Sequence, residues 1–408
     1  MFGILSMSQT YSKLYIHHIM KSFILIYSLL YIHDVFIFLI SGCSSLSSLK
    51  FWGDDEEGES PAELSNIDQS LQIEVEWNKK LGIGKNFGRI LPAIFNDNAY
   101  FISGDGELYS LNRETGQELW SRGTEDNVSG AISVGYKQIF YGTLDGEIVA
   151  LDIKGNEIWR SQTSSEILAP PVTNGSIVAV QTADGKVFGF NSKTGEELWI
   201  HQSSIPKLTL RGTATPILAK GFIFTGFANG KVAMIYPDSG AIRLEIPVTI
   251  NEGKSELERV VDIDGKSIVA DNLLVSASYQ GNITAINLLE GKIAWQEEVS
   301  TIHDLSSVRS TVIAIDEKDV LKGFGLSSGA ILWQQAGLKL RGLSSPVSIG
   351  SNFIVGDFEG YIHIINSKDG SFVARRKVSN KPILEIVSEG KNLLIMDEAG
   401  RLSYLSVG

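Results

Sequence analysis

The hydrophobic and polar residues of this chain alternate with a period of two over short runs that end in glycine. In the clearest segment, residues 99–103 are mostly apolar, Gly104-Asp105-Gly106 follows, and 107–111 alternates again. Such alternation is typical of β-strands, and the Asp-Gly pair favours a tight turn because glycine accepts positive φ without steric cost. A second turn at 112–116 and a further run at 117–121 predict three consecutive antiparallel strands.

A sixteen-residue pattern built on these turns recurs along the chain. It consists of Asp-Gly, an alternating stretch, Asn or Asp, a short gap, Thr-Gly, and Trp four residues after that glycine. The first glycine of each copy, or the aspartate that replaces it in the sixth copy, stands at 106, 146, 185, 230, 281, 319, 360 and 400. Eight copies about 40 residues apart predict an all-β fold, an eight-bladed β-propeller whose blades each have four antiparallel strands.

Two residue types recur at fixed places in the predicted blades. A four-stranded sheet cannot bury both of its faces alone, so a tryptophan at constant offset predicts packing between neighbouring blades. The tryptophans are Trp120, Trp159, Trp199, Trp295 and Trp333, with Leu244 and Ala374 in their place in two weaker copies. Proline lacks an amide donor and suits the start of a strand. The prolines that open most blades are Pro92, Pro171, Pro216, Pro346 and Pro382.

The two ends of the repeat region predict how the ring closes. The eighth copy has no outer strand, because the chain stops at Gly408. Residues 71–77 form an unassigned alternating run that ends in Trp77. We therefore expect this N-terminal strand to complete the last blade, which removes open sheet edges between the first and last blades.

Composition narrows the function classes. The formal net charge is −12, so the chain lacks the basic surface on which nucleic-acid binding depends. Cys43 is the only cysteine, which excludes an internal disulfide and a cysteine-rich zinc site. His201, His303 and His363 are scattered among the blades without metal-ligand spacing. The sequence therefore predicts no catalytic, cofactor-binding or metal-binding residues.

The N-terminal region carries a targeting signal. An apolar stretch at 22–40 follows Lys21 and ends in Ile40-Ser41-Gly42-Cys43, a small-residue cleavage site with cysteine directly after it. This arrangement resembles the lipobox of bacterial lipoproteins, which implies acylation of Cys43 and a stable membrane anchor. An uncleaved transmembrane helix is the alternative, since the stretch approaches the roughly 20 residues that span a bilayer.

These features predict three regions. Residues 1–42 are interpreted as a leader and lipoprotein signal peptide, with translation starting at Met20. Residues 43–70 are rich in serine and carry an acidic run, as expected of a flexible tether. Residues 71–408 form the propeller.

The repeat resembles the tryptophan-docking repeat of pyrroloquinoline-quinone dehydrogenases over residues 71–408. Two groups share that repeat in the bacterial envelope, the quinoprotein dehydrogenases and the BamB family of outer-membrane assembly lipoproteins. The short domain, the impossibility of an adjacent-cysteine disulfide and the lipobox all favour the BamB family.

The resemblance extends to two segments. Leu208-Thr209-Leu210-Arg211-Gly212 is similar to the BamB loop that contacts the third POTRA domain of BamA, and residues 258–264 are similar to the second partner-binding segment. The resemblance implies partner-binding roles for a set of five residues. They are Leu208, Leu210, Arg211, Asp262 and Asp264.

Two features of these segments leave a structural alternative open. Leu338-Lys339-Leu340-Arg341-Gly342 repeats the first motif at the same offset from a proline, so the motif is also explained by blade architecture with leucines in the core. Asp262 and Asp264 alternate around Ile263. On a strand they would share one face, as a solvated rim or as partners of basic side chains.

The resemblance implies a protein without cofactors or catalysis. It would be lipid-anchored on the periplasmic side of the outer membrane and bind BamA and other subunits of the assembly complex. Unfolded outer-membrane proteins are further implied partners. One alternative is a quinone-dependent or other small-ligand enzyme that uses the central channel, and another is an adaptor for a different envelope partner. The sequence leaves open which face of the ring carries the interface.

Overall fold

The computed structural model divides the chain into two units, Met1–Glu59 and Ser60–Gly408. The residues that it describes are 59–85, 89, 91–210, 212–250 and 253–408. The predicted signal peptide, the alternative membrane helix and Cys43 all lie outside the described residues. Within the described part of the chain, no helix has the length and apolar character needed to cross a membrane.

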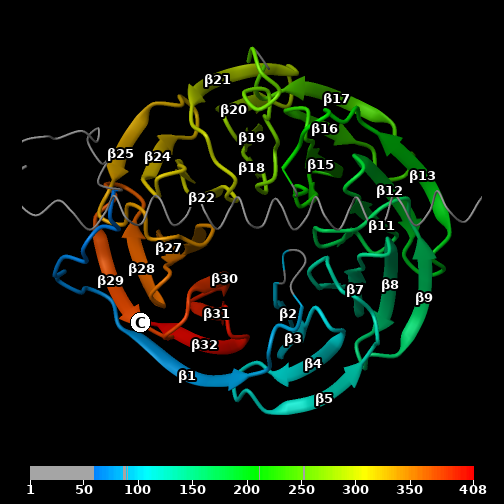
Figure 1. The fold of residues 1–408 in the computed structure, drawn as a ribbon, viewed down its shortest axis with the longest axis horizontal. Helices are drawn as coiled ribbons and strands as arrows, with labels where there is room; N and C mark the ends of the chain where they lie inside the picture. The colour runs from blue at the N-terminus through cyan, green and yellow to red at the C-terminus, as the bar shows by residue number, and fades with distance from the viewer. Residues whose placement is uncertain (1–58, 86–88, 90, 211, 251–252) are drawn as a thin grey trace, which may run out of the picture. The chain divides into compact units, whose positions relative to one another are not determined.

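The second unit is an eight-bladed β-propeller, as predicted. Its strands form eight four-stranded antiparallel sheets arranged in a ring (Figure 1). Within a blade the first strand lies toward the centre of the ring and the fourth at the rim (Figure 1).

Blades 1 to 4 follow one another in chain order. They consist of β2 (Ala93–Phe95), β3 (Asn98–Ile102), β4 (Glu107–Asn112) and β5 (Glu118–Gly123); β6 (Ser133–Gly135), β7 (Gln138–Gly142), β8 (Glu147–Asp152) and β9 (Glu157–Gln162); β10 (Val172–Thr173), β11 (Ile177–Gln181), β12 (Lys186–Asn191) and β13 (Glu197–Gln202); and β14 (Ile217–Ala219), β15 (Phe222–Gly226), β16 (Lys231–Ile235) and β17 (Ile242–Pro247).

Blades 5 to 8 continue the series, and the last blade takes its outer strand from the N-terminal end. They consist of β18 (Ile268–Ala270), β19 (Leu273–Ala277), β20 (Asn282–Asn287) and β21 (Lys292–Glu298); β22 (Ser306–Val308), β23 (Thr311–Ile315), β24 (Leu321–Gly325) and β25 (Ile331–Gln335); β26 (Val347–Ile349), β27 (Asn352–Gly356), β28 (Tyr361–Asn366) and β29 (Phe372–Lys377); and β30 (Ile383–Glu389), β31 (Asn392–Asp397), β32 (Arg401–Val407) and β1 (Ile73–Lys80).

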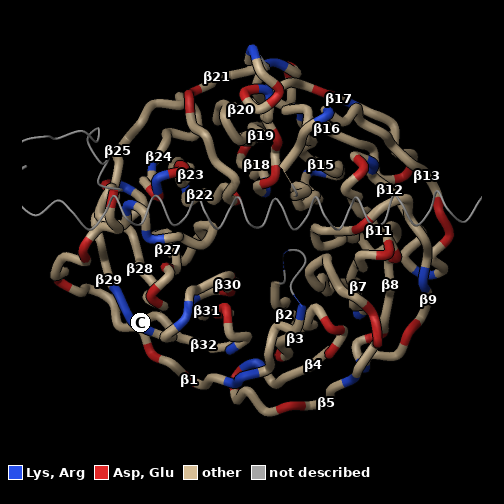
Figure 2. The backbone as a smooth tube through the Cα atoms, viewed as in Figure 1, with Lys and Arg blue, Asp and Glu red and all other residues tan. Residues whose placement is uncertain are grey.

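The core lies between the blades, at the second and third strands. The second strand of every blade lacks charged residues except for Asp397 at the end of β31, and Figure 2 shows the charged residues mainly on turns and outer strands. The second and third strands are buried over most of their length, whereas the outer strands keep many exposed positions. Burial at successive positions of these strands shows that neighbouring blades cover both faces of each sheet.

The recurrent tryptophan docks on the next blade. The indole N–H of Trp159 in blade 2 donates to the carbonyl of Ser192 in blade 3 at 2.8 Å. Its ring lies over Gly195, where an added Cβ would come within 2.6 Å of the indole. Gly195 also has φ of 73°, so both the close approach and the backbone conformation require glycine. The same contact recurs for Trp77, Trp199, Trp295 and Trp333.

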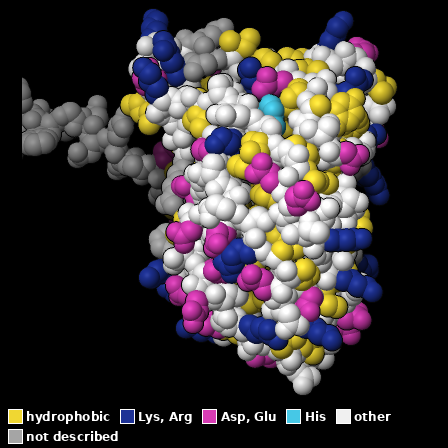
Figure 3. Space-filling model, turned by 90° about the vertical axis from the view of Figure 1, so that its right-hand side faces the viewer, with side chains coloured by type: hydrophobic (Ala, Val, Ile, Leu, Met, Phe, Trp, Pro, Cys, Tyr) yellow, Lys and Arg dark blue, Asp and Glu magenta, His cyan; other side chains and the backbone are white. Residues whose placement is uncertain are grey.

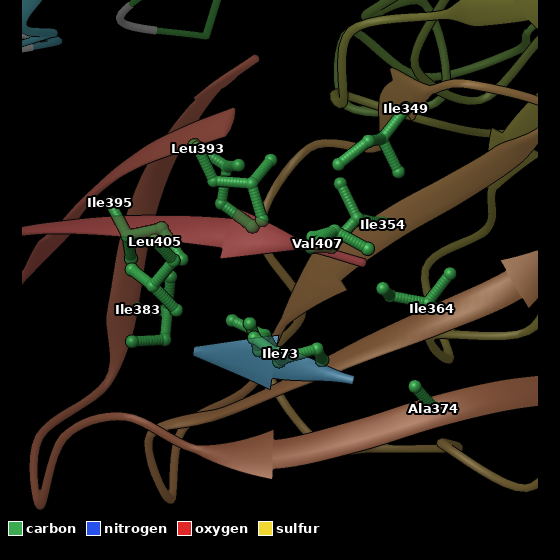
Figure 4. Packing of buried hydrophobic residues seen from close by; sticks show 12 residues of the cluster. Ile73, Ile349, Ile354, Ile364, Ala374, Ile383, Leu393, Ile395, Leu405 and Val407 are labelled. Carbon is green, nitrogen blue, oxygen red and sulfur yellow. The ribbon is translucent and has the colours of Figure 1, made fainter. Parts of the chain in front are cut away.

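The weak copy that ends in Ala374 is explained by its place in the ring. Ala374 lies in blade 7, and its neighbour is blade 8, in which β32 ends at the chain terminus and no turn glycine connects it to the outer strand. An indole would have no turn on which to dock. Ala374 instead packs in a cluster with Ile73, Ile354 and Val407 (Figure 4).

The predicted closure is confirmed. β1 pairs antiparallel with β32 from Ile73 opposite Val407 to Lys80 opposite Arg401, with a bulge between Val75 and Trp77. The N-terminal strand thus becomes the outer strand of the last blade, beside the C-terminus (Figure 1). Blades 1 to 7 are each formed by a continuous stretch of chain, whereas blade 8 combines the two ends of the domain and so closes the ring.

Residues ahead of β1 also belong to the second unit. The sequence placed the start of the propeller at residue 71, but the chain from Ser60 already packs against blade 7. Ala62 N–H donates to Lys339 O and Ser70 N–H donates to Val373 O, each at 2.9 Å. Leu64 packs against a core cluster of blades 6 and 7. This segment has no alternation, so a repeat pattern could not reveal it.

The segments that join successive blades lie on one face of the ring. Each such connector passes over the turn between the second and third strands of the blade that it enters. Backbone amides of these turns donate to connector carbonyls, as in Ala183 to Glu166 at 3.0 Å, Tyr279 to Asp262 at 2.9 Å and Phe358 to Arg341 at 3.0 Å. We call this side the connector face. The turns between third and fourth strands, such as the one that contains Leu289, lie on the opposite face.

Candidate functional site

The two segments singled out from the sequence lie next to each other on the connector face. The first connector (residues 203–216) joins β13 to β14, and the second connector (residues 248–267) joins β17 to β18. Leu210 N–H donates to Oδ2 of Asp262 at 2.5 Å, although the two residues are 52 positions apart. Asp264 packs on Gly212, where an added Cβ would lie 2.6 Å from its carboxyl carbon.

The leucines of the first connector reach the surface to different degrees. Leu208 is 39% exposed and Leu210 is half-buried. Beside Leu210 is a cleft of about 350 Å³, whose other wall comes from blade 3 and includes Glu166, Leu168 and Asp184. Arg211 lies outside the described residues. The connector therefore presents apolar side chains next to an acidic cleft.

The second copy of the leucine and arginine motif has a different role. Leu338 is fully buried, and the Arg341 side chain is 4% exposed. Arg341 pairs with the fully buried Asp357 at 2.8 Å and also with Glu359. His363 contacts the same Asp357 carboxylate at 3.0 Å. In blade 7 Leu338 and Arg341 are buried, as the architectural reading of the sequence predicts, whereas Leu340 is half-buried.

Blade 4 lacks the carboxylate that holds the arginine in blade 7. Asp357 begins the turn after β27, and its amide donates to Tyr361 O at 2.9 Å. The residue at the same point of blade 4 is Phe227, whose amide donates to Lys231 O at 2.9 Å. The two copies of the motif are thus set in different surroundings, although their sequences match.

The aspartates of the second connector do not lie on one face of a strand, as their alternation around Ile263 had suggested. They lie in irregular chain and not on a strand, and Asp262 is only 1% exposed. Ile263 between them packs on Gly226, where a Cβ would come within 2.2 Å of its side chain. The description of Asp262 as part of a solvated rim is therefore wrong, because the connector is pressed into the space that Gly226 leaves. Asp264 is half-buried.

Burial sets the electrostatics of this pair. It raises the pKa of Asp262 to about 7, and the nearby carboxylate of Asp264 adds to the shift. Burial likewise raises the pKa of Asp264 to about 6. Oδ1 of Asp262 has no hydrogen-bond partner among the described residues. The site thus holds two acids that ionise near neutral pH at the cost of folding stability.

We expect Asp262→Asn to change how stability depends on pH. A folded-state pKa above the unfolded value gives stability that is present at low pH and is lost as pH rises through the folded pKa. The wild type should therefore lose stability between pH 5 and pH 8 relative to the variant. The melting temperature of the variant minus that of the wild type should be greater at pH 8 than at pH 5 by about 3 °C or more.

Asp238→Asn is the matched control, because Asp238 is exposed on the opposite face of blade 4. Its difference from the wild type should be the same at both pH values. A pH-independent difference for Asp262→Asn would contradict the raised pKa.

A second charge cluster, whose side chains are half-buried, lies at the hub of the ring and was missed by the sequence analysis. Arg89 donates to Asp304 at 2.7 Å and to Glu385 at 2.8 Å. Burial alone would lower the pKa of Arg89, but the two carboxylates raise it. These groups line a cavity of about 400 Å³ together with Lys266 and several serines. Since the partners are 215 and 296 residues apart, no local pattern could have predicted them.

The hub cluster is balanced in charge, with Arg89 and Lys266 facing Asp304 and Glu385. Among the residues that the structure describes, no group of three histidine, cysteine, aspartate or glutamate side chains is arranged to hold a metal ion. The ion pairs at the hub thus connect the chain ahead of blade 1 to blades 6 and 8.

The flank of the ring offers a third surface. The outer strands β9 and β13 expose Ile158, Leu198 and Ile200 at 45%, 44% and 48%. Figure 3, which faces the right-hand edge of Figure 1, shows hydrophobic side chains there among acidic and basic ones. These aliphatic residues recur singly from blade to blade, as is normal for a protein surface.

Comparisons with known proteins agree on one family. The family model described as "Outer membrane protein assembly factor BamB" matches residues 104–335. The assembly factor BamB of Bordetella pertussis is 30% identical over 370 residues, which cover 88% of this chain and 94% of that protein. That of Pseudomonas aeruginosa is 35% identical, covering 84% of this chain and 88% of that protein.

Solved structures show the same likeness. The crystal structure of BamB from Moraxella catarrhalis is 25% identical with a TM-score of 0.76, covering 82% of this chain and all of that one. A quinohemoprotein alcohol dehydrogenase from Pseudomonas putida is 12% identical with a TM-score of 0.64, over 82% of this chain and 76% of that one. At that identity the dehydrogenase shares the fold alone.

Proposed function

Because this chain belongs to the BamB family of outer membrane protein assembly factors, we propose that its connector face binds the periplasmic POTRA domains of BamA. The chain is an accessory factor of outer-membrane protein assembly, and its relatives are named as assembly factors and not as enzymes. Other subunits of the complex and unfolded outer-membrane proteins are further proposed partners.

One observation carries the choice of surface. The first and second connectors come from different blades, yet they join at the hydrogen bond between Leu210 and Asp262 to form one continuous region. Leu208 is exposed at its edge, beside the cleft that Glu166 and Asp184 line. An apolar group with charged residues around it is compatible with the centre and rim of a protein interface. The five residues singled out from the sequence therefore belong to two adjoining connectors on one face, although the side chain of Asp262 is itself buried.

A propeller suits this role because it is a rigid support. Each connector is tied to a blade turn by backbone hydrogen bonds and to the previous blade by packing, as Ile263 is to Gly226. Contacts held in place before binding cost little conformational entropy when the partner arrives. We infer that the ring holds the flexible periplasmic arm of its partner in a defined pose, and we propose no catalytic step.

We expect Leu208→Asp to weaken binding to the isolated POTRA domains by at least about tenfold, because it places a charge in the apolar part of the interface. Isothermal titration calorimetry with the mature chain measures this directly. Leu198→Asp on β13 is the matched control, since Leu198 has similar exposure but lies on the flank. Equal loss of affinity in both variants, or in neither, would contradict the proposed surface.

We also propose that acylated Cys43 anchors the chain to the periplasmic side of the outer membrane, following cleavage of the signal peptide after Gly42. Several acyl chains hold a protein on a membrane far more firmly than one. Cys43→Ser should move the protein from the membrane fraction to the soluble periplasmic fraction and abolish incorporation of labelled palmitate. Mass spectrometry of the mature N-terminus provides an independent check, and an unmodified Met1 would contradict the anchor.

A further inference from the structure

The chain ahead of β1 does not leave the ring where β1 begins. Ile73 pairs with Val407 at the end of β32, the third strand of blade 8, so β1 starts on the face opposite the connectors. Residues 60–70, which we call the strap, begin their contacts on that same face. Ser70 N–H donates at 2.9 Å to Val373 O, near the start of β29.

From this point the strap crosses the flank of blade 7 to the connector face, beside β29 (Figure 1). Arg375 in β29 donates to Ser65 O at 2.7 Å. The amide of Ala62 donates to Lys339 O at 2.9 Å, and Arg341 Nη1 donates to Ala62 O at 2.9 Å. Lys339 and Arg341 belong to the connector that joins blades 6 and 7. The strap therefore carries the chain from one face of the ring to the other.

The two arginines that hold the strap are themselves held by buried side chains. Arg341 has a side chain that is 4% exposed, and it pairs with Asp357 at 2.8 Å. His363 contacts the same carboxylate at 3.0 Å, and its Nδ1 accepts from Arg375 Nε at 3.0 Å. Leu64 adds an apolar contact with the core cluster of blades 6 and 7. The path of the strap is thus fixed at several points along its length.

From this path we propose that the strap determines which face of the ring is turned toward the membrane. The inference rests on the proposed lipid anchor and adds the orientation of the proposed docking surface. The chain enters the ring at Ser60, on the connector face, so the anchor at Cys43 draws that face toward the lipid. Without the strap the chain would enter at the start of β1, on the opposite face. The two docking connectors are therefore presented toward the membrane.

The length of the chain between the anchor and the strap makes the point of entry important. Sixteen residues separate Cys43 from Ser60. A flexible chain of that length has a typical end-to-end distance of about 20–25 Å. The eight residues of β1, which follow the depth of blade 8, span about 26 Å. A tether that starts on one face therefore reaches past the ring to the other face only when it is stretched, at a cost in chain entropy.

Energy transfer to labelled lipid measures this orientation. The acylated chain is bound to phosphatidylcholine vesicles that carry an acceptor dye on some headgroups, and the absence of net lipid charge removes electrostatic orientation. The donor dye is attached through Glu398→Cys on the connector face of blade 8, where the Glu398 amide donates to Pro382 O, or through Lys391→Cys at the other end of that blade. Both side chains are exposed. Transfer from position 398 should be at least about twofold more efficient than from position 391.

Leu64→Asp should release the strap, because it places a charge in the core cluster of blades 6 and 7. The tether then starts on the opposite face, so the difference between positions 398 and 391 should vanish or reverse. Ser65→Asp is the matched control. It adds the same charge one residue along, on an exposed side chain, and should keep the wild-type difference. A second variant joins residue 59 directly to Leu71, and we expect it to reverse the difference.

Equal transfer from the two positions in the wild type would overturn the inference. An unchanged difference in the variant that lacks the strap would also overturn it, and this result with a lowered melting temperature is what a purely stabilising strap predicts. Failure of the chain to bind the vesicles would overturn the anchor and the orientation together. Calorimetry with the POTRA domains in solution is independent of the membrane. Absence of binding there, with the transfer difference intact, would contradict only the proposed docking.

Discussion

Removal of residues 71–80 should abolish cooperative folding of the domain. β1 supplies the whole outer strand of blade 8, and its pairing with β32 closes the ring. Without it, Val407 and Leu405 lose their cover and β32 becomes an open edge. Circular dichroism during heating should show no sharp transition, or one far below that of the complete domain.

Trp77→Ala tests the same closure with the strand in place. The indole N–H donates to Arg113 O in blade 1 at 2.8 Å, and the ring stacks on Tyr404 at 5.9 Å. Truncating this half-buried side chain should destabilise the domain by about 3 kcal/mol and lower the melting temperature by about 4 °C. Lys79→Ala, which removes an ion pair with Glu118 on the same strand, should shift it by about 1 °C at most. Comparable shifts in the two variants would contradict closure through the indole.

Arg341→Ala should destabilise the domain by about 3–5 kcal/mol, because it leaves Asp357 buried without its cation. Arg341 Nη1 also donates to Ala62 O at 2.9 Å, so the segment ahead of β1 loses a hydrogen bond as well. The melting temperature should fall by about 4–7 °C. Differential scanning calorimetry of the mature chain measures both quantities.

Arg211→Ala is the experiment to compare with Arg341→Ala, because Arg211 and Arg341 occupy the same place in matching motifs. Phe227 replaces the carboxylate that holds Arg341, so the stability of blade 4 should not depend on an equivalent ion pair. We expect a melting temperature within about 1 °C of the wild type together with a large loss of affinity for the POTRA domains. A large loss of stability here, or an unchanged one in Arg341→Ala, would contradict the distinction between the two copies.

The fold could be predicted from the sequence because every blade uses the same turns, strands and packing contacts. Asp-Gly turns, alternating strands and a docked indole each leave a mark at constant spacing, and eight such marks define the blades. A departure from the repeat pattern also has a structural explanation. Asp319 replaces the turn glycine in the sixth copy and adopts φ of 59°, while its carboxylate accepts the Gly342 amide at 2.7 Å. This side-chain hydrogen bond allows a residue other than glycine to fill the turn.

The site could be predicted only in part, because connectors have no period. The motif at 208–212 and the insertion before β18 singled out two segments that the structure brings together, but the burial of Asp262 depends on space left by Gly226 in another blade. For the same reason the repeat gave no sign of the hub cluster around Arg89. The two Leu-x-Leu-Arg-Gly motifs also differ in burial despite their matching sequences, because Leu338 is buried whereas Leu208 is exposed.

The most direct test of the account is to locate the partner on the ring inside cells. A photo-crosslinking residue at position 208 reports on the connector face, and one at Leu289, which is 75% exposed, reports on the opposite face. We predict a crosslink to the POTRA domains of BamA from position 208 and none from position 289. A crosslink from position 289 alone would contradict docking through the connector face.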